Sequence, residues 1–426
     1  MASSGIGVGL VGLGTIGTGV VRVFREHADE IEARLGFPLR LAHIADVDLE
    51  TDRGVSLEGY RLSRDFKALV EDEAIDLVVE LIGGTTIAAQ VVTSALEAGK
   101  GVVTANKALL AHKGAEIYAL AETHGAPVAF EASVGGTIPV LRALREGLCA
   151  DRLFALRGIV NGTCNYILSS MESDGEPYEA CLKRAQELGY AEADPTFDVD
   201  GTDSAHKLAI LLGLAFGVHA RPGDFYSRGI QLIAPADIRA ARRMGLRIKL
   251  LASARRLDTG VEARVEPTLI PTGSVLAGVD GSMNAIEVRG KMSGPTLYYG
   301  AGAGSLPTAS AVVADLMELA RARRLGVALR VPPLGTHRLE PSGLLSSDQE
   351  RGEYFVRLEL GEEDRSRRVS VALAEHGVPL VSLESPPGED LTLTTGETSR
   401  AALDSALALI GSAASASHVI RIEKEI

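Results

Sequence analysis

A glycine turn near the N-terminus constrains the fold of this chain more than any other feature. Residues 6–14, IGVGLVGLG, have the continuous apolar character of a strand buried in a parallel sheet, and residues 15–34 continue as a helix. The junction has the pattern G-x-G-x-x-G, formed by Gly12, Gly14, Thr15, Ile16 and Gly17. Such glycines permit a tight turn, close approach of a pyrophosphate and close helix packing. A purely structural turn is the alternative, but the flanking strand and helix favour a dinucleotide-binding site.

Strands and helices alternate regularly after this turn. Further strands are predicted at 38–46, 74–84, 100–105 and 127–136, with a helix at 86–98. This alternation predicts a Rossmann-type, doubly wound α/β domain over residues 1–150. An open parallel sheet binds ligands at the carboxyl ends of its strands. We therefore expect that edge to carry Gly83, Gly84, Thr85, Asn106 and Lys107.

Asp46 ends the second predicted strand, with Asp48 just beyond it and the first following arginine only at Arg53. An acid at this position accepts a hydrogen bond from a ribose 2'-hydroxyl and repels a 2'-phosphate. We therefore expect NAD in preference to NADP. The alternative is an exposed turn acid, because Asp46 lies further from the glycines than the usual spacing of about twenty residues.

Residues 189–207, GYAEADPTFDVDGTDSAHK, combine acids with one lysine and precede an apolar helix at 208–218. Asp203 and Lys207 are one helical turn apart, so Lys207 faces an apolar stripe with Asp203, Asp198 and Glu192 as its nearest acidic partners in sequence. Such a lysine can donate a hydrogen bond to a reacting oxygen or exchange a proton with it, while spare carboxylates bind an ammonium. The pattern predicts a pocket for a small amino acid with a hydroxyl or carbonyl group. The alternative is a solvated loop with one structural ion pair.

Composition excludes several classes of partner and compartment. The net charge of −13 and the absence of a basic run argue against nucleic acid or anionic lipid as a partner. The three cysteines, Cys149, Cys164 and Cys181, are an odd number without C-x-x-C spacing, which fits reduced thiols in the cytoplasm. The apolar N-terminus has no basic flank, so we expect neither a targeting nor a membrane segment.

The rest of the chain predicts two further units. Residues 151–300 alternate less regularly and predict an α+β substrate-binding domain, a sheet with helices on one face. Residues 301–330 contain a helix that we expect to pack back on the first domain. A linker is predicted at 331–350, and the pattern of residues 351–426 predicts a β-α-β-β-α-β domain.

Six motifs in order resemble the homoserine dehydrogenases over essentially the whole chain. They are ELIGGT (80–85), VVTANKALLA (102–111), EASVGGTIP (131–139), GIVNGTCNYIL (158–168), QELGYAEADPTFDVDGTDSAHKLAILL (186–212) and YGAGAGSLPTASAVVADL (299–316). The resemblance implies reversible, NAD(P)H-dependent reduction of L-aspartate 4-semialdehyde to L-homoserine, which feeds threonine, methionine and isoleucine biosynthesis. It also implies a homodimer or homotetramer built through the middle domain.

The same resemblance implies roles for particular residues. Lys207 would be catalytic, with Lys107 beside it near the nicotinamide, and the substrate would be held by Glu192, Asp198, Asp203 and Lys207. The implied cofactor contacts are Thr85, Lys107, Gly189 and Gly302, and a monovalent cation such as Na⁺ would be held by the main-chain carbonyls of Glu131, Val134, Gly136 and Ile138. The tail resembles an ACT regulatory domain, whose usual Asp-x-Pro-Gly turn here reads Asp364, Arg365, Ser366, Arg367. Binding of an amino-acid effector there stays open.

Two rival functions remain at this point. Cys164, at a predicted helix start, could be the thiolate nucleophile of a phosphorylating semialdehyde dehydrogenase, although a small core thiol is the plainer reading. A non-catalytic nucleotide and amino-acid sensor is the second rival. His206 beside Lys207 has no second histidine at ligand spacing, so we expect a packing role for it.

Overall fold

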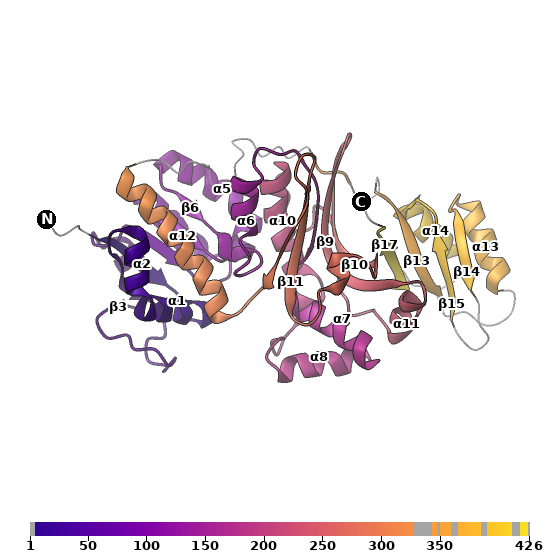
Figure 1. Ribbon diagram of the computed structural model, residues 1–426, viewed down its shortest axis with the longest axis horizontal. Helices are drawn as coiled ribbons and strands as arrows, with labels where there is room; N and C mark the ends of the chain where they lie inside the picture. The colour runs from indigo at the N-terminus through magenta and orange to yellow at the C-terminus, as the bar shows by residue number, and fades with distance from the viewer. Residues whose placement is uncertain are drawn as a thin grey trace.

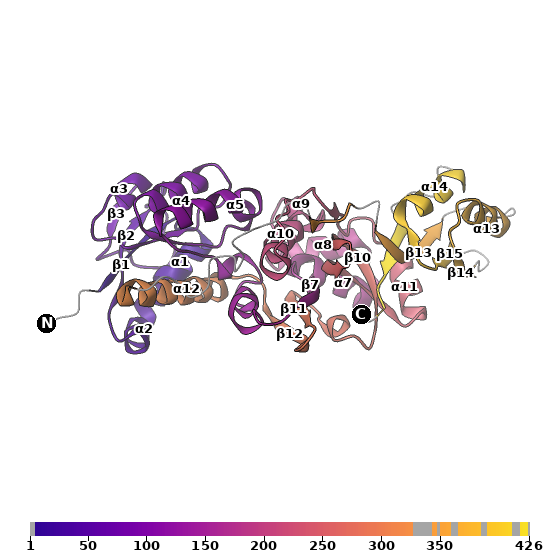
Figure 2. The same cartoon turned by 90° about the horizontal axis from the view of Figure 1, so that it is seen from above.

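A computed structural model describes residues 5–326, 343–346, 350–358, 365–384, 390–410 and 418–424. Three units follow one another along the long axis of the molecule, with the N-terminal unit at one end and the C-terminal unit at the other (Figures 1 and 2). Most of the predicted linker and Asp364 of the predicted tail turn lie outside the described residues. No helix in the described part of the chain is long and apolar enough to cross a membrane.

The N-terminal unit contains a six-stranded parallel sheet of order β3-β2-β1-β4-β5-β6. Its strands are β1 (Ile6–Val11), β2 (Leu39–Ala45), β3 (Arg61–Ser63), β4 (Leu77–Glu80), β5 (Gly101–Thr104) and β6 (Val128–Ala129). The strand order reverses between β1 and β4, which is where open α/β sheets bind their ligands. The doubly wound α/β fold predicted from the alternation is confirmed.

Helices cover both faces of this sheet. They are α1 (Thr15–Glu26), α2 (Ala28–Leu35), α3 (Phe66–Val70), α4 (Ile87–Glu97), α5 (Lys107–His124) and, from later in the chain, α12 (Ser305–Leu325). Buried residues of α1 and α12 share one apolar cluster with β1, whereas α4 and α5 belong to the cluster on the other face. A Cβ on Gly19 would lie 2.7 Å from the carbonyl oxygen of Ser305, so α12 returns to direct contact with α1 (Figure 1).

Two elements of the N-terminal unit differ from the prediction. The helix predicted at 15–34 is broken at His27, which leaves helical geometry with φ −124° and caps both α1 and α2. The strand predicted at 127–136 ends at Ala129, because the backbone N–H of Glu131 donates to Asp315 on α12 at 2.8 Å instead of to a strand. A 3-10 turn, Glu131–Ser133, follows.

A second sheet runs through the middle and C-terminal units. Its order is β12-β11-β7-β9-β10-β17-β13-β15-β14, with the strands β7 (Leu153–Ile159), β9 (Leu246–Leu257), β10 (Gly260–Pro271), β11 (Met283–Gly290), β12 (Gly294–Ala301), β13 (Arg351–Leu358), β14 (Leu380–Glu384), β15 (Leu391–Thr395) and β17 (Val419–Ile422). β8 (Tyr226–Ser227) and β16 (Thr398–Ser399) lie off this path. The two units are joined where β10 pairs in parallel with β17.

The middle unit carries its helices on one face of the sheet, as predicted. These are α7 (Gly162–Asp174), α8 (Tyr178–Glu187), α9 (Thr196–Val199), α10 (Thr202–Phe216) and α11 (Pro235–Arg243). Along β10, the apolar residues Ala263, Val265 and Leu269 join the helix-side core. The alternate residues Glu262, Arg264 and Glu266 are buried on the opposite face, which is therefore charged.

The C-terminal unit has the predicted β-α-β-β-α-β order, with α13 (Arg365–Glu375), α14 (Arg400–Ile410) and the short β16 as an addition. Its four main strands are antiparallel in the order β17-β13-β15-β14. Residues 343–346, within the predicted linker, lie against β10, where the Leu345 N–H donates to the Val261 carbonyl at 2.9 Å.

Candidate active site

Helix α10 places an acid and a lysine on one buried face. The Nζ atom of Lys207 donates to Asp203 Oδ2 at 2.7 Å and to the carbonyl oxygen of Val160, just after β7, at 2.6 Å. Lys207 is 8% exposed and Asp203 6%. The helix begins after Gly201, whose φ of +91° turns the acidic loop into the core. The predicted pairing of these two residues is therefore present.

A second lysine reaches the same carboxylate from the N-terminal unit. Lys107 is the first residue of α5, and its Nζ lies 2.9 Å from Asp203 Oδ1. Asp203 thus lies between two ammonium groups, one from each unit. The Lys107 side chain is 41% exposed and that of Lys207 only 10%, so Lys107 is the outer and Lys207 the inner of the two lysines.

The pKa values of the two lysines are shifted in opposite directions. Burial lowers the pKa of Lys207, and the charge of Lys107 lowers it further against the pull of Asp203. The pKa of Lys107 is raised, chiefly by the charge of Asp203. Although burial acts in the opposite direction, Lys207 and Lys107 hold the pKa of Asp203 below its ordinary value. The deeper lysine therefore releases its proton more readily than the outer one.

Asn161 connects the acidic loop to this pair. Its Nδ2 atom donates to Asp198 Oδ1 at 2.8 Å and to Asp203 Oδ2 at 3.0 Å, while its Oδ1 atom caps α7 at the Cys164 N–H. Burial, and next the charge of Asp203, raise the pKa of Asp198. Glu192 is exposed on the loop, but its charge contributes to the raised pKa of Lys107. The structure thus gathers the predicted acids, with Glu192 at the rim.

The glycine turn has the form needed for a dinucleotide. Gly12 has φ +102°, and a Cβ on Gly17 would lie 2.0 Å from the Gly12 carbonyl oxygen. A Cβ on Gly14 would meet nothing within 4 Å, and no side chain caps α1 there. The backbone N–H groups at the start of α1 therefore face open space that an anion can occupy. Thr15 and Ile16 form the first turn of this helix.

Asp46 is held against the same turn. Its Oδ2 atom accepts from the Leu13 N–H at 2.5 Å, and its Oδ1 atom accepts from the Asp48 N–H at 2.8 Å. Asp48 itself pairs with Arg53 at 2.9 Å. Asp46 is therefore a half-buried residue of the glycine turn and not a free acid in an exposed turn.

A buried network that the sequence did not reveal organises the sheet edge. Glu80, fully buried at the end of β4, accepts from Thr104 Oγ1 at 2.6 Å and from the Ile82 N–H at 2.9 Å. Asn106 caps α5 and donates to the Gly84 carbonyl at 2.8 Å. Burial raises the pKa of Glu80. These contacts fix the loops that carry Thr85 and Lys107.

The loop that carries the predicted cation ligands has carbonyl groups available. Gly135 and Gly136 both have positive φ, +73° and +58°. Among the described residues, no hydrogen bond ends on the carbonyl oxygens of Val134 or Gly136, whereas those of Glu131 and Ile138 each accept one backbone N–H. Carbonyl oxygens are hard donors that suit an alkali cation. The described part of the chain has no group of three or more His, Cys, Asp or Glu residues that could hold a metal.

The two remaining predicted cofactor residues lie apart. Gly302 follows β12, and its carbonyl oxygen would be 2.7 Å from a Cβ on Gly136. Gly189, with φ +76°, lies in an exposed turn after α8. The described contacts join Gly302 to the loop of Gly136 but do not join Gly189 to the glycine turn.

Cys164 is unsuited to nucleophilic chemistry. It is fully buried in α7, and its Sγ atom donates to the Asp198 carbonyl at 3.2 Å. Burial first, and then the charges of Asp198 and Asp203, raise the pKa of the thiol well above its ordinary value. The rival reading of Cys164 as a reactive thiolate is therefore wrong.

We expect Cys164→Ser to retain activity within about threefold, since the thiol serves only as a small, weakly hydrogen-bonded core group. Steady-state assays of the dehydrogenase activity that the family resemblance implies, with and without phosphate, measure this. Loss of turnover in a folded variant, together with a requirement for phosphate, would restore the nucleophile reading.

His206 has a partner that sequence spacing did not predict. His112 of α5 places its Nε2 atom 3.3 Å from Nε2 of His206, and the two rings meet edge to face. Burial, and next His112, lower the pKa of His206 to about 4. Sequence spacing could not reveal His112 as a neighbour, because α5 and α10 meet only in the folded chain. The buried ring of His206 packs against His112, in keeping with the expected packing role.

His206 should make the protein sensitive to acid. Its folded pKa lies below the ordinary 6.5, so between these values the unfolded chain binds more protons and stability falls as the pH falls. This group alone contributes up to about 1.4 kcal/mol per pH unit. Denaturant unfolding at pH 7 and pH 5 should therefore show a smaller loss for His206→Gln than for the wild type. Equal losses in both proteins would contradict this assignment.

Comparison with known proteins places these features in one family. Two family models match the chain, homoserine dehydrogenase over residues 139–317 and homoserine dehydrogenase, NAD binding domain, over residues 12–131. The homoserine dehydrogenase of Neisseria gonorrhoeae is 45% identical over 381 residues, which cover 89% of this chain and 87% of that protein. That of Pseudomonas aeruginosa is 44% identical over 388 residues, 90% and 88% of the two chains. The crystal structure of a homoserine dehydrogenase from Thiobacillus denitrificans is similar with a TM-score of 0.93 and 44% identity, covering 99% of this chain and 98% of that one.

Proposed function

The chain belongs to the homoserine dehydrogenase family, and on that premise we propose that Lys207, Lys107 and Asp203 form its catalytic centre. As a member of this family it is an NAD(P)-dependent oxidoreductase that interconverts L-aspartate 4-semialdehyde and L-homoserine in amino-acid biosynthesis. One observation carries the proposal: a buried carboxylate holds two lysines, one from each unit, beside the edge of the nucleotide-binding sheet.

The acids of the loop hold the substrate. The α-ammonium group of the substrate binds among the carboxylates of Asp198 and Glu192, because Asp203 is already occupied by two lysines. Burial and the neighbouring charge of Asp203 destabilise the Asp198 carboxylate, and its pKa is raised for that reason. Binding of a cationic ligand offsets this destabilisation. The reacting end of the substrate then extends toward Lys207.

The lysines act on the oxygen of the substrate. In the direction of reduction, the ammonium groups of Lys207 and Lys107 stabilise the charge that develops on the aldehyde oxygen, and a proton reaches that oxygen from a lysine or a bound water. Each donor contributes roughly 3 to 4 kcal/mol to the transition state. Asp203 and the Val160 carbonyl position Lys207. The bound dinucleotide supplies the hydride, and the turn formed by Gly12, Gly14 and Gly17 holds its pyrophosphate.

A spectrophotometric assay tests the function. When homoserine is added with oxidised dinucleotide, the absorbance at 340 nm should increase. The rate of this increase should saturate with homoserine concentration and should not require phosphate. A protein that only senses nucleotides and amino acids would produce none, and that result would refute the assignment.

We further propose that NAD is preferred to NADP. Asp46 presents a carboxylate at the end of β2, where it can accept from a ribose 2'-hydroxyl and repel a 2'-phosphate. Asp46→Asn is expected to weaken NAD binding by about tenfold and to raise the kcat/KM for NADP relative to that for NAD. Kinetics with both coenzymes measure this, and an unchanged ratio of kcat/KM values would remove Asp46 from coenzyme selection.

The remaining roles follow from the family resemblance. We propose that the carbonyls of Glu131, Val134, Gly136 and Ile138 hold a monovalent cation such as Na⁺, which would stabilise the loop that contacts Gly302.

We also propose that the chain forms a homodimer or homotetramer through the middle unit and that its location is cytoplasmic. The three free thiols are consistent with that compartment. We propose in addition that the C-terminal unit can bind an amino-acid effector. Sedimentation and assays with and without threonine test the assembly and the effector.

A further inference from the structure

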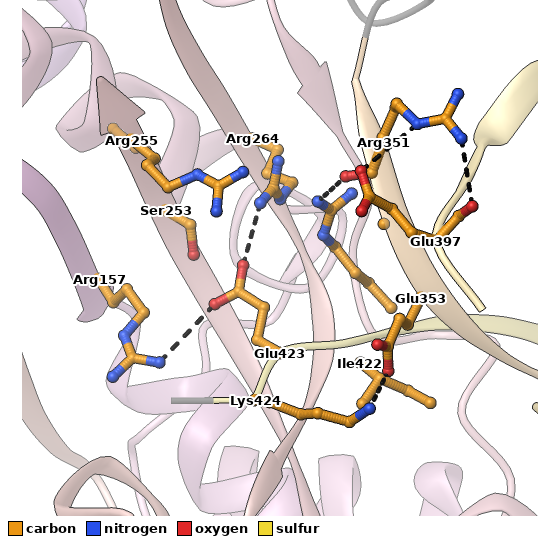
Figure 3. A pocket seen from close by; sticks show the side chains of 13 residues that line it. Arg157, Ser253, Arg255, Arg264, Arg351, Glu353, Glu397, Ile422, Glu423 and Lys424 are labelled. Atoms are coloured by element: carbon orange, nitrogen blue, oxygen red, sulfur yellow. Dashed lines mark hydrogen bonds and ion pairs between the residues drawn. The ribbon is translucent and has the colours of Figure 1, made fainter. Parts of the chain in front are cut away.

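A charged pocket of about 210 Å³ lies where the middle and C-terminal units share their sheet (Figure 3). Strands β7, β9 and β10 of the middle unit and β13 and β17 of the C-terminal unit contribute its walls. The charged lining residues are Arg157, Arg255, Arg264, Arg351, Glu353, Glu397, Arg421, Glu423 and Lys424. The pocket belongs to the face opposite the helices, so it is separate from the site around Lys207.

The carboxylates of this pocket already have cationic partners. Glu423 accepts from Arg264 at 3.1 Å, Glu353 lies 2.5 Å from Lys424, and Glu397 lies 3.4 Å from Arg351. Figure 3 shows these pairs around the cavity. Each lining acid therefore has a cationic partner, although Glu423 Oε2 accepts no hydrogen bond from the described residues and lies 3.9 Å from Arg157.

Arg421 is the exception among the lining arginines. It is 5% exposed, and among the described residues it makes no ion pair within 4.0 Å of a carboxylate. Its Nη2 atom donates to the Arg351 carbonyl at 2.6 Å, its Nη1 atom reaches the Tyr354 hydroxyl only at 3.4 Å, and its guanidinium stacks over the Tyr354 ring. The charge of Arg421 acts to lower the pKa values of Glu423 and Glu350, so carboxylates lie nearby. None of the described carboxylates is in contact with the guanidinium, and a buried guanidinium without a contacting anion is costly.

Two further features show that the pocket is built around this cation. Ser253, 5% exposed on the opposite wall, has a hydroxyl without a hydrogen-bond partner, and so do the Nε atoms of Arg255, Arg264 and Arg421. A Cβ on Gly352 would lie 2.6 Å from the Arg421 guanidinium carbon. Gly352 does not have positive φ, so space for the guanidinium, and not backbone conformation, accounts for the glycine.

We propose that this pocket binds a small oxyanion, a phosphate or carboxylate group of a small molecule, with Arg421 as its principal ligand. Guanidinium groups bind both kinds of oxyanion through paired hydrogen bonds. The volume admits a small metabolite and excludes a dinucleotide. Such a ligand would connect β9 and β10 of the middle unit with β17 of the C-terminal unit, and would stabilise their junction.

Calorimetric titration of the full chain with inorganic phosphate, and separately with malonate, tests the proposal at constant ionic strength. The wild type should bind at least one of the two saturably, and the stronger binder identifies the group as phosphate or carboxylate. Arg421→Met should weaken binding by at least tenfold, and Gly352→Ala should weaken it while leaving the charge in place. Arg323→Met, on α12 and paired with Asp76, is the matched control and should bind as the wild type does.

The outcomes separate this proposal from the catalytic one. Turnover of homoserine without added anion should be unchanged in Arg421→Met, because Arg421 is remote from the lysines. Arg421→Lys is a second variant that controls for misfolding. It keeps the positive charge and should bind the anion with intermediate affinity. Absence of saturable binding in the wild type, or equal binding in a folded Arg421→Met, would overturn the proposal. A change of sedimentation coefficient in Arg421→Met, without anion binding by the wild type, would instead show that a second copy fills the pocket and would equally overturn it.

Discussion

Replacing Lys207 with methionine is expected to lower turnover by roughly 10²- to 10³-fold while dinucleotide affinity changes by less than about twofold. The ammonium group is buried between Asp203 and the Val160 carbonyl, and in the proposed mechanism it stabilises the reacting oxygen and does not contact the dinucleotide at the glycine turn. Its removal costs the transition state about 3 to 4 kcal/mol. Methionine fills a similar volume, so the fold should persist.

Steady-state oxidation of homoserine and fluorescence titration of the reduced dinucleotide measure the two quantities. Lys183→Met is the matched control, because that lysine is 78% exposed on α8 and should leave turnover intact. A folded Lys207→Met protein with near-normal turnover would remove Lys207 from the chemistry.

Asp203→Asn is expected to have the second large effect, on stability as well as on rate. The substitution keeps the shape of the side chain but leaves two lysines without the charge that neutralises them. Removing one partner of a buried ion pair typically costs about 3 to 5 kcal/mol. Without the carboxylate, the pKa values of Lys207 and Lys107 should both fall, so the lysines lose their protons at a lower pH.

The lower pKa values of the two lysines should change the pH dependence of the reaction, which would not happen if Asp203 had only a structural role. The alkaline limb of the pH profile for aldehyde reduction should move to lower pH in Asp203→Asn, because a neutral lysine no longer stabilises the oxyanion. Denaturant unfolding and the pH–rate profile measure the two effects. Asp194 is an exposed acid of the same loop, and its hydrogen bonds with the described residues go to Thr196, so Asp194→Asn should change neither. An unmoved alkaline limb in Asp203→Asn would contradict the proposed coupling.

Local patterns were enough to predict the contact between Asp203 and Lys207. Asp203 and Lys207 are four residues apart on a helix, so their contact follows from helical geometry alone. The glycine turn was equally readable because strand, turn and helix are consecutive in sequence. The strand pattern placed Lys107 at the carboxyl edge of the sheet, and the family resemblance added its place beside Lys207. No local pattern could give its contact with Asp203.

Long-range contacts explain what the sequence did not reveal. Asn161 reaches Asp203 across 42 residues, and His112 reaches His206 across 94, so neither pair has a periodicity to detect. Glu80 lies inside the strand predicted at 74–84, and its burial depends on Thr104 of the neighbouring strand, whose hydroxyl donates to it. Likewise, the strand at 127–136 is cut short by Asp315, which lies 184 residues away from Glu131.

A crystal structure of the ternary complex with homoserine and oxidised dinucleotide would test the proposed roles of the two lysines. We predict that the hydroxyl oxygen of homoserine lies within hydrogen-bonding distance of Lys207 Nζ or Lys107 Nζ, with its carbon facing C4 of the nicotinamide. We also predict that the α-ammonium group lies beside the carboxylates of Asp198 and Glu192. A homoserine hydroxyl bound away from both lysines, with Lys207 still buried against Asp203, would contradict the proposed roles.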